Sequence, residues 1–329
     1  MTALRPPAAQ PERRTRLADA YSRAAAIAAR HGKSYHLATR LLTPDRRPAV
    51  HALYAAARTA DDLVDLPGPD PAAALTDWSR ALLAELESGW SEDPVRLALV
   101  HTVRRYGIPV EHLVDFLAAM SSDLDVTGYA DLEALDRYMW GSAAVIGLQV
   151  LPVLGTAAGV PREEAEPYAI ALGEAFQLTN FLRDVAEDAD RGRVYLPADL
   201  MAAHGVTREQ LAEKRHDARF AALMREMVAV VRRRYDDAAP GTPLLAPESR
   251  DCVRAATALY GGILTAIERA DYRVLDRRVG VSRPRRLAVF ARRLTAAQLA
   301  RVRVTMAKPK SRSSTGAQAM RGPQIADGS

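Results

Sequence analysis

An all-α fold is predicted by the composition of the chain and by the spacing of its charged residues. Hydrophobic residues make up 48% of the 329 residues, enough to bury a substantial core, whereas aromatic residues make up only 6%. Alanine-rich runs such as residues 52–57 favour helix over strand, because alanine has the highest helix propensity. Carboxylates also recur four residues apart, which places them on one face of a helix. The length fits one large domain.

Proline and glycine delimit the expected helices in order along the chain. Residues 1–14, rich in Pro and Arg, are expected to form a flexible leader, and a helical region follows from Leu17 to the break at Gly32. A helix over 44–65 should end at the Pro- and Gly-rich segment 66–71. Further helices are expected over residues 72–88, 94–106, 110–122, 131–154, 161–189, 207–238 and 247–274, with a loop over 190–197. A single domain is expected over 15–305, followed by a disordered basic tail over 306–329.

One stretch has the length of a membrane span. Residues 138–160 contain no charged side chain over 23 positions. Glycines, Gln149 and Pro152 interrupt the apolar run, so we expect a bent helix that is buried in protein and lines a cavity. Apolar residues between 143 and 151 would supply the wall of that cavity.

Positive charge is concentrated near the C-terminal end. Residues 273–329 hold 14 Lys and Arg against two Asp, whereas the first 272 residues hold 31 against 38. The arginines from Arg283 to Arg303 could attract anionic lipid headgroups, which would give peripheral membrane contact; the alternative is a solvated helical face and a disordered tail. Nucleic acid is not expected, because no recognition motif accompanies the charge. The single cysteine, Cys252, excludes an intrachain disulfide and agrees with a cytoplasmic location.

Two pairs of aspartates define the candidate site. Asp61 and Asp65 lie near the end of one predicted helix, and Asp184 and Asp188 lie near the end of another. Carboxylates four residues apart share one helical face and repel each other unless a cation lies beside them. If the two helices face each other, the four carboxylates form an oxygen-rich site suited to Mg2+, which keeps several waters and bridges to phosphates. A diphosphate substrate is therefore predicted.

Each aspartate pair continues a polar stripe along its helix. Tyr54 and Arg58 precede the first pair on the same face, and Gln177 and Asn180 precede the second. Arg58 could hold phosphate oxygens in a fork that Lys cannot reproduce. Metal ions and cationic side chains would stabilise the negative charge that develops on a departing diphosphate. The spacing predicts a metal-diphosphate site without naming the reaction.

The chain resembles the phytoene/squalene synthase family, the head-to-head prenyltransferases. The resemblance rests on Ser34-Tyr35, on Leu-Leu-Thr-Pro at 41–44, on the segment from Ala52 to Asp-Asp-Leu-Val-Asp at 61–65, and on 177–197 with Gly-Arg-Val-Tyr-Leu-Pro at its end. A late match includes Tyr260, Ile263, Leu264 and Tyr272. It implies an isoprenoid synthase fold around a central cavity and three Mg2+ ions, which Mn2+ could replace. It also implies that two prenyl diphosphates are joined through a cyclopropylcarbinyl diphosphate.

The resemblance also implies roles for individual residues. The metal ligands would be Asp61, Asp65, Asp184 and Asp188, with Asp62 and Glu187 beside them. The residues at the reaction centre would be Tyr54, Arg58, Gln177, Asn180, Tyr195 and Tyr260. The residues that contact diphosphate would be His31, Lys33, Ser34, Tyr35, Arg58, Arg183, Arg193, Tyr260 and Arg277.

Plainer interpretations stay open for three of these side chains. Tyr54 and Tyr260 could pack in the core with the hydroxyl at the surface, and Arg183 could simply pair with Glu187 one turn away. Trp140 stands where the family commonly has an aromatic hydroxyl. Because Trp has no acceptor oxygen, a proton-handling role at that position is in question.

The motifs are most similar to those of the bacterial carotenoid branch, which implies condensation of two geranylgeranyl diphosphates to phytoene. The alternative is a squalene or dehydrosqualene synthase that uses two farnesyl diphosphates. A terpene cyclase would usually carry an Asn/Ser/Glu second motif, which the Asp184 and Asp188 pair opposes. A non-enzymatic interaction protein would be expected to have lost a metal carboxylate or Arg58, and all are present. NADPH is not expected, because no GxGxxG motif follows a strand.

Overall fold

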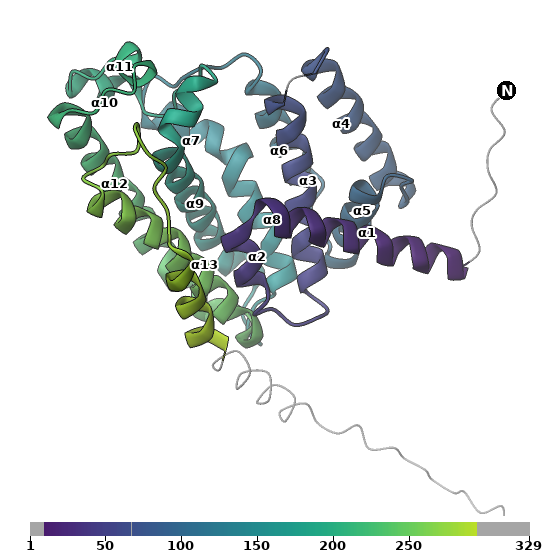
Figure 1. Cartoon of the computed structure of the whole chain (residues 1–329). Coiled ribbons are helices and arrows are strands. Elements are labelled where there is room, and N and C mark those ends of the chain that lie inside the picture. Colours follow the sequence, from purple (N-terminus) through teal and green to yellow (C-terminus); the bar gives the residue numbers. More distant parts are fainter. Residues whose placement is uncertain (1–9, 67, 295–329) are drawn as a thin grey trace, which may run out of the picture.

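The fold of the chain is all-helical, as the sequence predicts. The computed structural model describes residues 10–66 and 68–294, which form helices joined by short loops (Figure 1). The extended backbone pairs only in isolated bridges over these ranges, at Gly128 with Val194 and at Thr156 with Leu245. The expected tail over 306–329 lies outside the described residues.

Short loops join the helices in chain order. The first half of the chain contains α1 (Gln10–His31), α2 (Lys33–Thr39), α3 (Arg47–Asp65), α4 (Pro71–Ser88), α5 (Pro94–Tyr106), α6 (Glu111–Ser122), α7 (Leu132–Met139), the π-helical turn η1 (Trp140–Ala144) and α8 (Val145–Leu154). The second half contains α9 (Arg162–Asp190), α10 (Ala198–Ala203), α11 (Arg208–Ala212), α12 (Ala218–Ala238), the 3-10 turn η2 (Ala239–Leu244) and α13 (Pro247–Arg269). Residues 283–294 are also helical.

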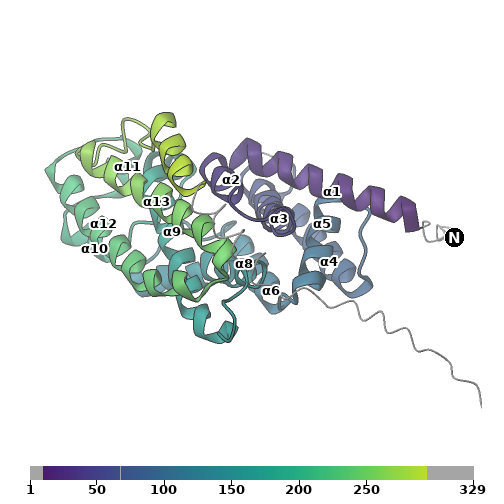
Figure 2. The same ribbon diagram turned by 90° about the horizontal axis from the view of Figure 1, so that it is seen from below.

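The helices pack as two groups that share one apolar core. In Figures 1 and 2, α9, α12 and α13 lie on one side, α1, α3, α4 and α5 on the other, and α8 lies between them. The long helix α9 packs against α12, α8, η1 and α13, whereas α3 packs against α1 and α5. Fully buried leucines on both sides, including Leu99 on α5 and Leu182 on α9, belong to one continuous hydrophobic cluster. This packing sets the two motif helices, α3 and α9, inside the molecule.

Aspartates cap several of these helices. Asp70, Asp93, Asp131 and Asp217 each precede the first helical residue and accept a backbone N–H from the first turn, at 2.7 to 2.9 Å. A side-chain oxygen at this position satisfies an N–H that has no partner within the helix. The negative charge also favours the positive end of the helix dipole. These residues therefore define where α4, α5, α7 and α12 begin.

Several helix boundaries differ from the sequence prediction. The helix α1 begins at Gln10, so residues 10–14 of the expected leader are helical. The short helix α2 was not expected, because Gly32 was interpreted only as a break. The single helix expected over 207–238 is divided into α11 and α12, since Asp217 starts a new helix after Lys214 adopts a positive φ of 52°. The helix expected to reach residue 274 ends at Arg269, before Asp271 and Tyr272 turn the chain with positive φ.

The uncharged stretch over 138–160 lies mostly in α7, η1 and α8, which follow one another without a gap, so the expected interruption of one helix takes the form of a π turn. The π turn begins at Trp140. The next residue is Gly141, where a side chain would not fit, because a Cβ would lie 2.6 Å from the carbonyl oxygen of Asp115 on α6. Such π turns often occur at functional sites. Trp140 is 44% exposed, and its Nε1 donates to the Asp115 carboxylate at 2.9 Å. Among the residues that the structure describes, we find no helix with the length and hydropathy needed to cross a bilayer.

Candidate active site

The first acidic motif lies at the C-terminal end of α3. Asp61 and Asp65 occupy its last two turns, and Arg58 lies one turn before them. The Arg58 Nη1 atom is 2.9 Å from the Asp61 carboxylate, and its Nη2 atom donates to Asp62. Burial, together with the neighbouring Asp65 charge, raises the pKa of Asp61 to about 6. This face of α3 therefore holds carboxylates that favour a cation beside them.

The second acidic motif lies in the last turns of α9, where the helix kinks. Asp184 has non-helical backbone angles, φ −104° and ψ 15°. Its carboxylate accepts from Nε of Arg183 at 2.8 Å. Burial and the charge of Asp184 raise the pKa of Asp188 to about 7. The two motifs thus share one electrostatic feature, a partly buried carboxylate with a raised pKa next to a like charge.

The loop after α9 brings the two motifs together. Arg193 donates to Asp65 at 2.5 Å across 128 positions of sequence. Arg191 lies 3.4 Å from the Asp65 carboxylate and 3.9 Å from that of Asp188. The Asp65 charge also contributes to the raised pKa of Asp188. The faces predicted from helical spacing therefore meet, as the site requires.

Backbone geometry in this loop fixes the direction of the two arginines. Gly192 has a φ of +77°, a conformation that glycine adopts without strain, and it reverses the chain directly after α9. The N–H of Val194 then donates to the carbonyl oxygen of Thr127 at 2.9 Å and anchors the loop to the segment before α7. Arg191 and Arg193, on either side of the turn, consequently point toward the carboxylates.

The donor set fits Mg2+, although the carboxylates are not drawn into one cluster. Oxygen ligands are what Mg2+ prefers, and carboxylates held near each other against their own repulsion gain from a cation. Within residues 10–66 and 68–294, no three acidic or metal-ligating side chains converge closely enough to hold one ion. Arginine side chains lie between them instead, with Arg58 on the first motif, Arg183 on the second and Arg191 and Arg193 across both.

Three of the predicted tyrosines form the boundary of the site on the side of α2 and α13. Tyr54 on α3 stacks on Tyr35 of α2, with ring centroids 5.0 Å apart, and Tyr260 of α13 stacks on Phe176 of α9 at 4.5 Å. Burial and the proximity of Tyr260 raise the pKa of Tyr54 to about 12, so its hydroxyl stays protonated. Arg183 is close enough to Tyr260 to affect its pKa. Tyr54 therefore lies near the first motif, where Asp61 and Asp62 affect its pKa, and Tyr260 lies near the second.

Tyr195 belongs to a separate aromatic cluster below the first motif. Its ring lies parallel to that of Phe181, with centroids 3.8 Å apart, and it also stacks with Tyr129 and Tyr138. The Tyr138 hydroxyl donates at 2.9 Å to Asp123, a buried carboxylate at the end of α6. Burial raises the pKa of Asp123 to about 6. The charges of Asp61 and Asp65 raise it further, which places this cluster beside the first acidic motif.

Other predicted residues lie farther from the carboxylates. His31 and Lys33 are exposed on either side of Gly32, and neither forms an ion pair with an acidic residue of the described chain. Ser34 is half-buried at the start of α2. Gln177 and Asn180 are half-buried on α9, in the turns that precede the second motif.

Arg277 and its neighbour Arg278 have different partners in the structure. Arg277 donates to the backbone oxygen of Ala270 at 3.3 Å and not to a motif carboxylate. Arg278 instead lies 2.9 Å from Glu187 and 3.5 Å from Asp184. The two side chains point in different directions because the chain between α13 and residue 283 is irregular, where helical spacing gives no guide.

Three residues of the site were missed by the sequence reasoning. Arg191 lies within a motif that was recognised, so its paired position opposite Arg193 across Gly192 was a usable signal. Arg278 had no signal that separated it from Arg277. Asp123 gave none either, because an aspartate near a helix end usually faces solvent, and only the structure shows that it is buried.

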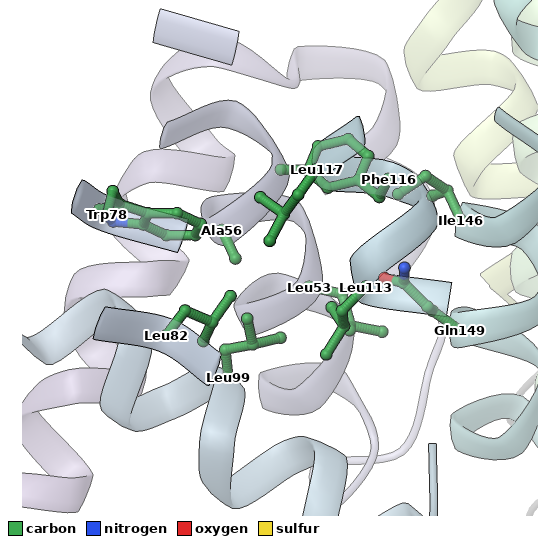
Figure 3. A pocket seen from close by; sticks show the side chains of 11 residues that line it. Leu53, Ala56, Trp78, Leu82, Leu99, Leu113, Phe116, Leu117, Ile146 and Gln149 are labelled. Atoms are coloured by element: carbon green, nitrogen blue, oxygen red, sulfur yellow. The ribbon is translucent and has the colours of Figure 1, made fainter. Parts of the chain in front are cut away.

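An apolar crevice lies beside α3 (Figure 3). Its lining comes from α3, α4, α5, α6 and α8: Leu53, Ala56, Ala57, Trp78, Leu82, Leu99, Leu113, Phe116, Leu117, Ile146 and Gln149. Of the apolar wall expected over 143–151, Ile146 lines this crevice, beside Gln149, whereas most of the other wall residues are buried in the core. The gaps between these side chains total about 260 Å³, including the open mouth. They are so narrow that a long apolar chain could enter only if side chains moved aside.

An all-helical fold with two aspartate pairs and flanking arginines is the arrangement expected of prenyltransferases that act on diphosphates. Comparison with known proteins agrees with this class. The profile described as Squalene/phytoene synthase matches residues 28–285. The chain therefore belongs to the squalene/phytoene synthase family.

Relatives and solved structures of the family are similar over most of the chain. Phytoene synthase 2 of Solanum lycopersicum is 36% identical over 82% of this chain and 88% of its own length. Phytoene synthase 2 of Zea mays is 36% identical over 82% of this chain and 68% of its own length. A dehydrosqualene synthase crystallised with a ligand has a TM-score of 0.79 and 27% identity, over 87% of this chain and 99% of that one. A squalene synthase from Alicyclobacillus acidocaldarius, at 23% identity and a TM-score of 0.70, shares the fold.

Proposed function

We propose that the chain joins two molecules of geranylgeranyl diphosphate head to head to give phytoene, through a cyclopropylcarbinyl diphosphate and with release of pyrophosphate. The observation that supports this most strongly is that Arg191 contacts the carboxylates of both Asp65 and Asp188, while Arg193, whose backbone N–H donates to the Asp188 carbonyl oxygen, also contacts Asp65. The relatives that are 36% identical are named phytoene synthases, which favours the C20 substrate.

The arginines of the site are placed to hold diphosphate oxygens. Arg58, Arg183 and Arg193 each contact a motif carboxylate, and their planar guanidinium groups can bind phosphate in a bidentate manner. We transfer the predicted contact of Arg277 to Arg278, because only Arg278 lies against the second motif. As charge builds on the leaving diphosphate, fixed positive side chains stabilise it more than they stabilise the substrate.

The carboxylates are the proposed metal ligands. Asp61, Asp65, Asp184 and Asp188 would hold Mg2+, which when bound supplies Lewis-acid neutralisation of the diphosphate oxygens. Their oxygen-only donor set and the raised pKa values of Asp61 and Asp188 support this assignment. The proposed site would hold three Mg2+ ions, which Mn2+ could replace, and the proposed reaction would not use NADPH. The proposed location of the chain is cytoplasmic.

The aromatic and apolar residues would protect the carbocation from water. Tyr54 and Tyr195 sit on opposite sides of the motif region, and their hydroxyl groups stay neutral because burial raises the pKa of both. Their ring faces can stabilise a neighbouring positive charge. The crevice beside α3 would take an apolar tail once its side chains move, and it would keep solvent from the reacting carbons.

A second candidate is favoured by one observation. The dehydrosqualene synthase has a TM-score of 0.79 against this chain, and this shared fold supports the second candidate, which would use a C15 substrate. The two substrates differ by one isoprene unit, which a few side-chain volumes in the tail-binding region decide.

Incubation of the purified chain with Mg2+ and either geranylgeranyl or farnesyl diphosphate tests the proposal. Gas chromatography with mass spectrometry should identify phytoene from the first substrate and little C30 hydrocarbon from the second. Dehydrosqualene or squalene as the main product would favour the second candidate. Release of pyrophosphate with a single-substrate cyclic terpene as product would reject head-to-head condensation.

A further inference from the structure

The surface helix over residues 283–294 has an apolar outward face. At 100° per residue, its exposed positions divide into a central strip and two edges. The central strip consists of Pro284, Leu287, Ala288 and Ala291. Leu287 is 61% exposed, the largest exposed fraction among the large hydrophobic residues of the described chain. A helix face that water alone covers would be expected to be polar.

Arginines border this apolar strip on both sides. Arg283 lies on one edge, and Arg285 and Arg292 lie on the other, and all three are exposed. None of them forms an ion pair with a described acidic residue, whereas the inward-turned Arg293 lies 3.9 Å from Asp251. An apolar strip between two cationic edges is the pattern of a helix that lies in the headgroup region of a bilayer. There the apolar side chains enter the acyl boundary while the guanidinium groups reach the phosphates.

The opposite face of the helix fixes its orientation on the molecule. Val289, Phe290 and Leu294 pack against the hydrophobic core. The Phe290 ring also lies under the guanidinium of Arg40 at 5.6 Å, which joins the helix to the end of α2. In Figures 1 and 2 the helix lies beside α2 in both views. The apolar strip therefore cannot turn inward and stays on the outside.

Positive charge predominates in the chain segments that form and adjoin this helix. Residues 277–294 contain seven arginines and no Asp or Glu. Residues 20–44, which form most of α1 and all of α2, contain Arg23, Arg30, Lys33 and Arg40 and again no acidic residue. Adjacent cationic segments attract the negative surface potential of a membrane that contains anionic lipid.

We propose that this face, made of the outward side of 283–294 and the neighbouring end of α2, docks the enzyme on anionic phospholipid bilayers. The inference rests on the proposed function for its purpose, since a prenyl diphosphate and a C40 hydrocarbon both partition into lipid. The chemistry recognised is a layer of phosphate headgroups above an apolar interior. Nucleic acid fits less well, because an apolar strip occupies the centre of the cationic surface.

Vesicle co-sedimentation of the full chain tests the proposal without substrate or Mg2+. Vesicles of phosphatidylcholine with about one third phosphatidylglycerol should bind the chain, and vesicles of phosphatidylcholine alone should bind it weakly. R283Q/R285Q should weaken partitioning by about 30-fold, given about 1 kcal/mol for each arginine near the surface. L287Q should weaken it by about tenfold, because one apolar side chain no longer enters the bilayer.

Matched variants elsewhere on the surface serve as controls. R80Q/R137Q makes the same change in net charge at two exposed arginines on α4 and α7, and V114Q removes an exposed apolar side chain from α6. Both should partition like the unmodified chain. Equal loss in R80Q/R137Q and R283Q/R285Q, or equal binding to neutral and anionic vesicles, would overturn the proposal.

Two further outcomes separate this inference from its rivals. Sedimentation velocity that shows a dimer lost in L287Q would assign the face to a second copy of the chain and reject lipid. Hydrocarbon formation measured in detergent is independent of docking, so an inactive chain that still binds vesicles would count against the proposed function alone. R283Q/R285Q that keeps activity in detergent but loses vesicle binding supports the docking face.

Discussion

Replacing Asp188 with Asn should stabilise the metal-free chain at alkaline pH while it removes function. Burial and the charge of Asp184 raise the pKa of Asp188 from 3.8 to about 7. A carboxyl group whose pKa is raised in the folded state contributes stability that is fully present below its unfolded-state pKa of 3.8. This contribution is lost as pH rises toward and through the folded-state pKa of about 7. The metal-free protein is therefore expected to be more stable near pH 5 than near pH 8, with Asp188 among the causes.

The size of the effect follows from the pKa and from the exposure of the group. Ionising a carboxyl group whose pKa has risen from 3.8 to about 7 costs roughly 4 kcal/mol at most at pH 8. The side chain is 15% exposed and Arg191 lies 3.9 Å away, so screening reduces the expected gain in D188N to about 1–2 kcal/mol. For a chain of this length that corresponds to a rise in Tm of about 2–4 °C at pH 8 and, because the unfolded state already ionises above pH 3.8, to roughly a third of that rise at pH 5.

Thermal unfolding with EDTA and with Mg2+ provides the assay. In EDTA, D188N should melt above the unmodified chain at pH 8. With millimolar Mg2+ the unmodified chain should gain stability because the folded state binds the ion, and D188N should gain less. The Tm difference between the two chains should therefore vanish or change sign. A variant that is less stable than the unmodified chain in EDTA at pH 8, or that gains as much from Mg2+, would refute the reasoning.

Three other substitutions test separate parts of the structure. In steady-state assays of pyrophosphate release, R278Q should lower kcat/KM by about 10- to 100-fold through loss of a charged hydrogen bond, whereas R277Q should change it less than threefold. Equal losses in the two variants would reject Arg278 as the diphosphate contact in place of Arg277. G173A should lower Tm although alanine favours helix, because its Cβ would lie 2.5 Å from the backbone oxygen of Ala143 in the π turn. The control G261A, whose Cβ would have no neighbour within 4 Å, should raise Tm by about 1–2 °C, and similar Tm values for the two variants would show that the chain relaxes to avoid the contact at residue 173. D93A should cost about 1 kcal/mol in denaturant unfolding through loss of the α5 cap, and an unchanged midpoint would show that the cap carries no stability.

The sequence predicted those parts of the site that regular helix geometry controls. Asp61 and Asp65, like Asp184 and Asp188, were placed on common faces because 3.6 residues per turn relates positions i and i+4 without any tertiary information. The motif resemblance added Arg193, whose contact with Asp65 spans the two halves of the chain.

The features that could not be predicted depend on packing between segments. The choice of Arg278 over Arg277 is made in an irregular segment, where no periodicity tells which side chain turns inward. The π turn at Trp140 arises because Gly141 lets α6 approach closely, and the sequence of a glycine does not name its neighbour. Asp123 is a site residue only because α7 and the loop over 191–197 cover it.

Pyrophosphate release from geranylgeranyl diphosphate, measured against Mg2+ concentration, tests the central claim that the two aspartate pairs act together on one diphosphate site. The account predicts Mg2+-dependent release by the unmodified chain and a loss of about 1,000-fold or more in both D61N and D184N. The two losses should also be far from additive in D61N/D184N, because the residues serve one site. Activity within tenfold of the unmodified chain in either single variant, or full activity in EDTA, would contradict it.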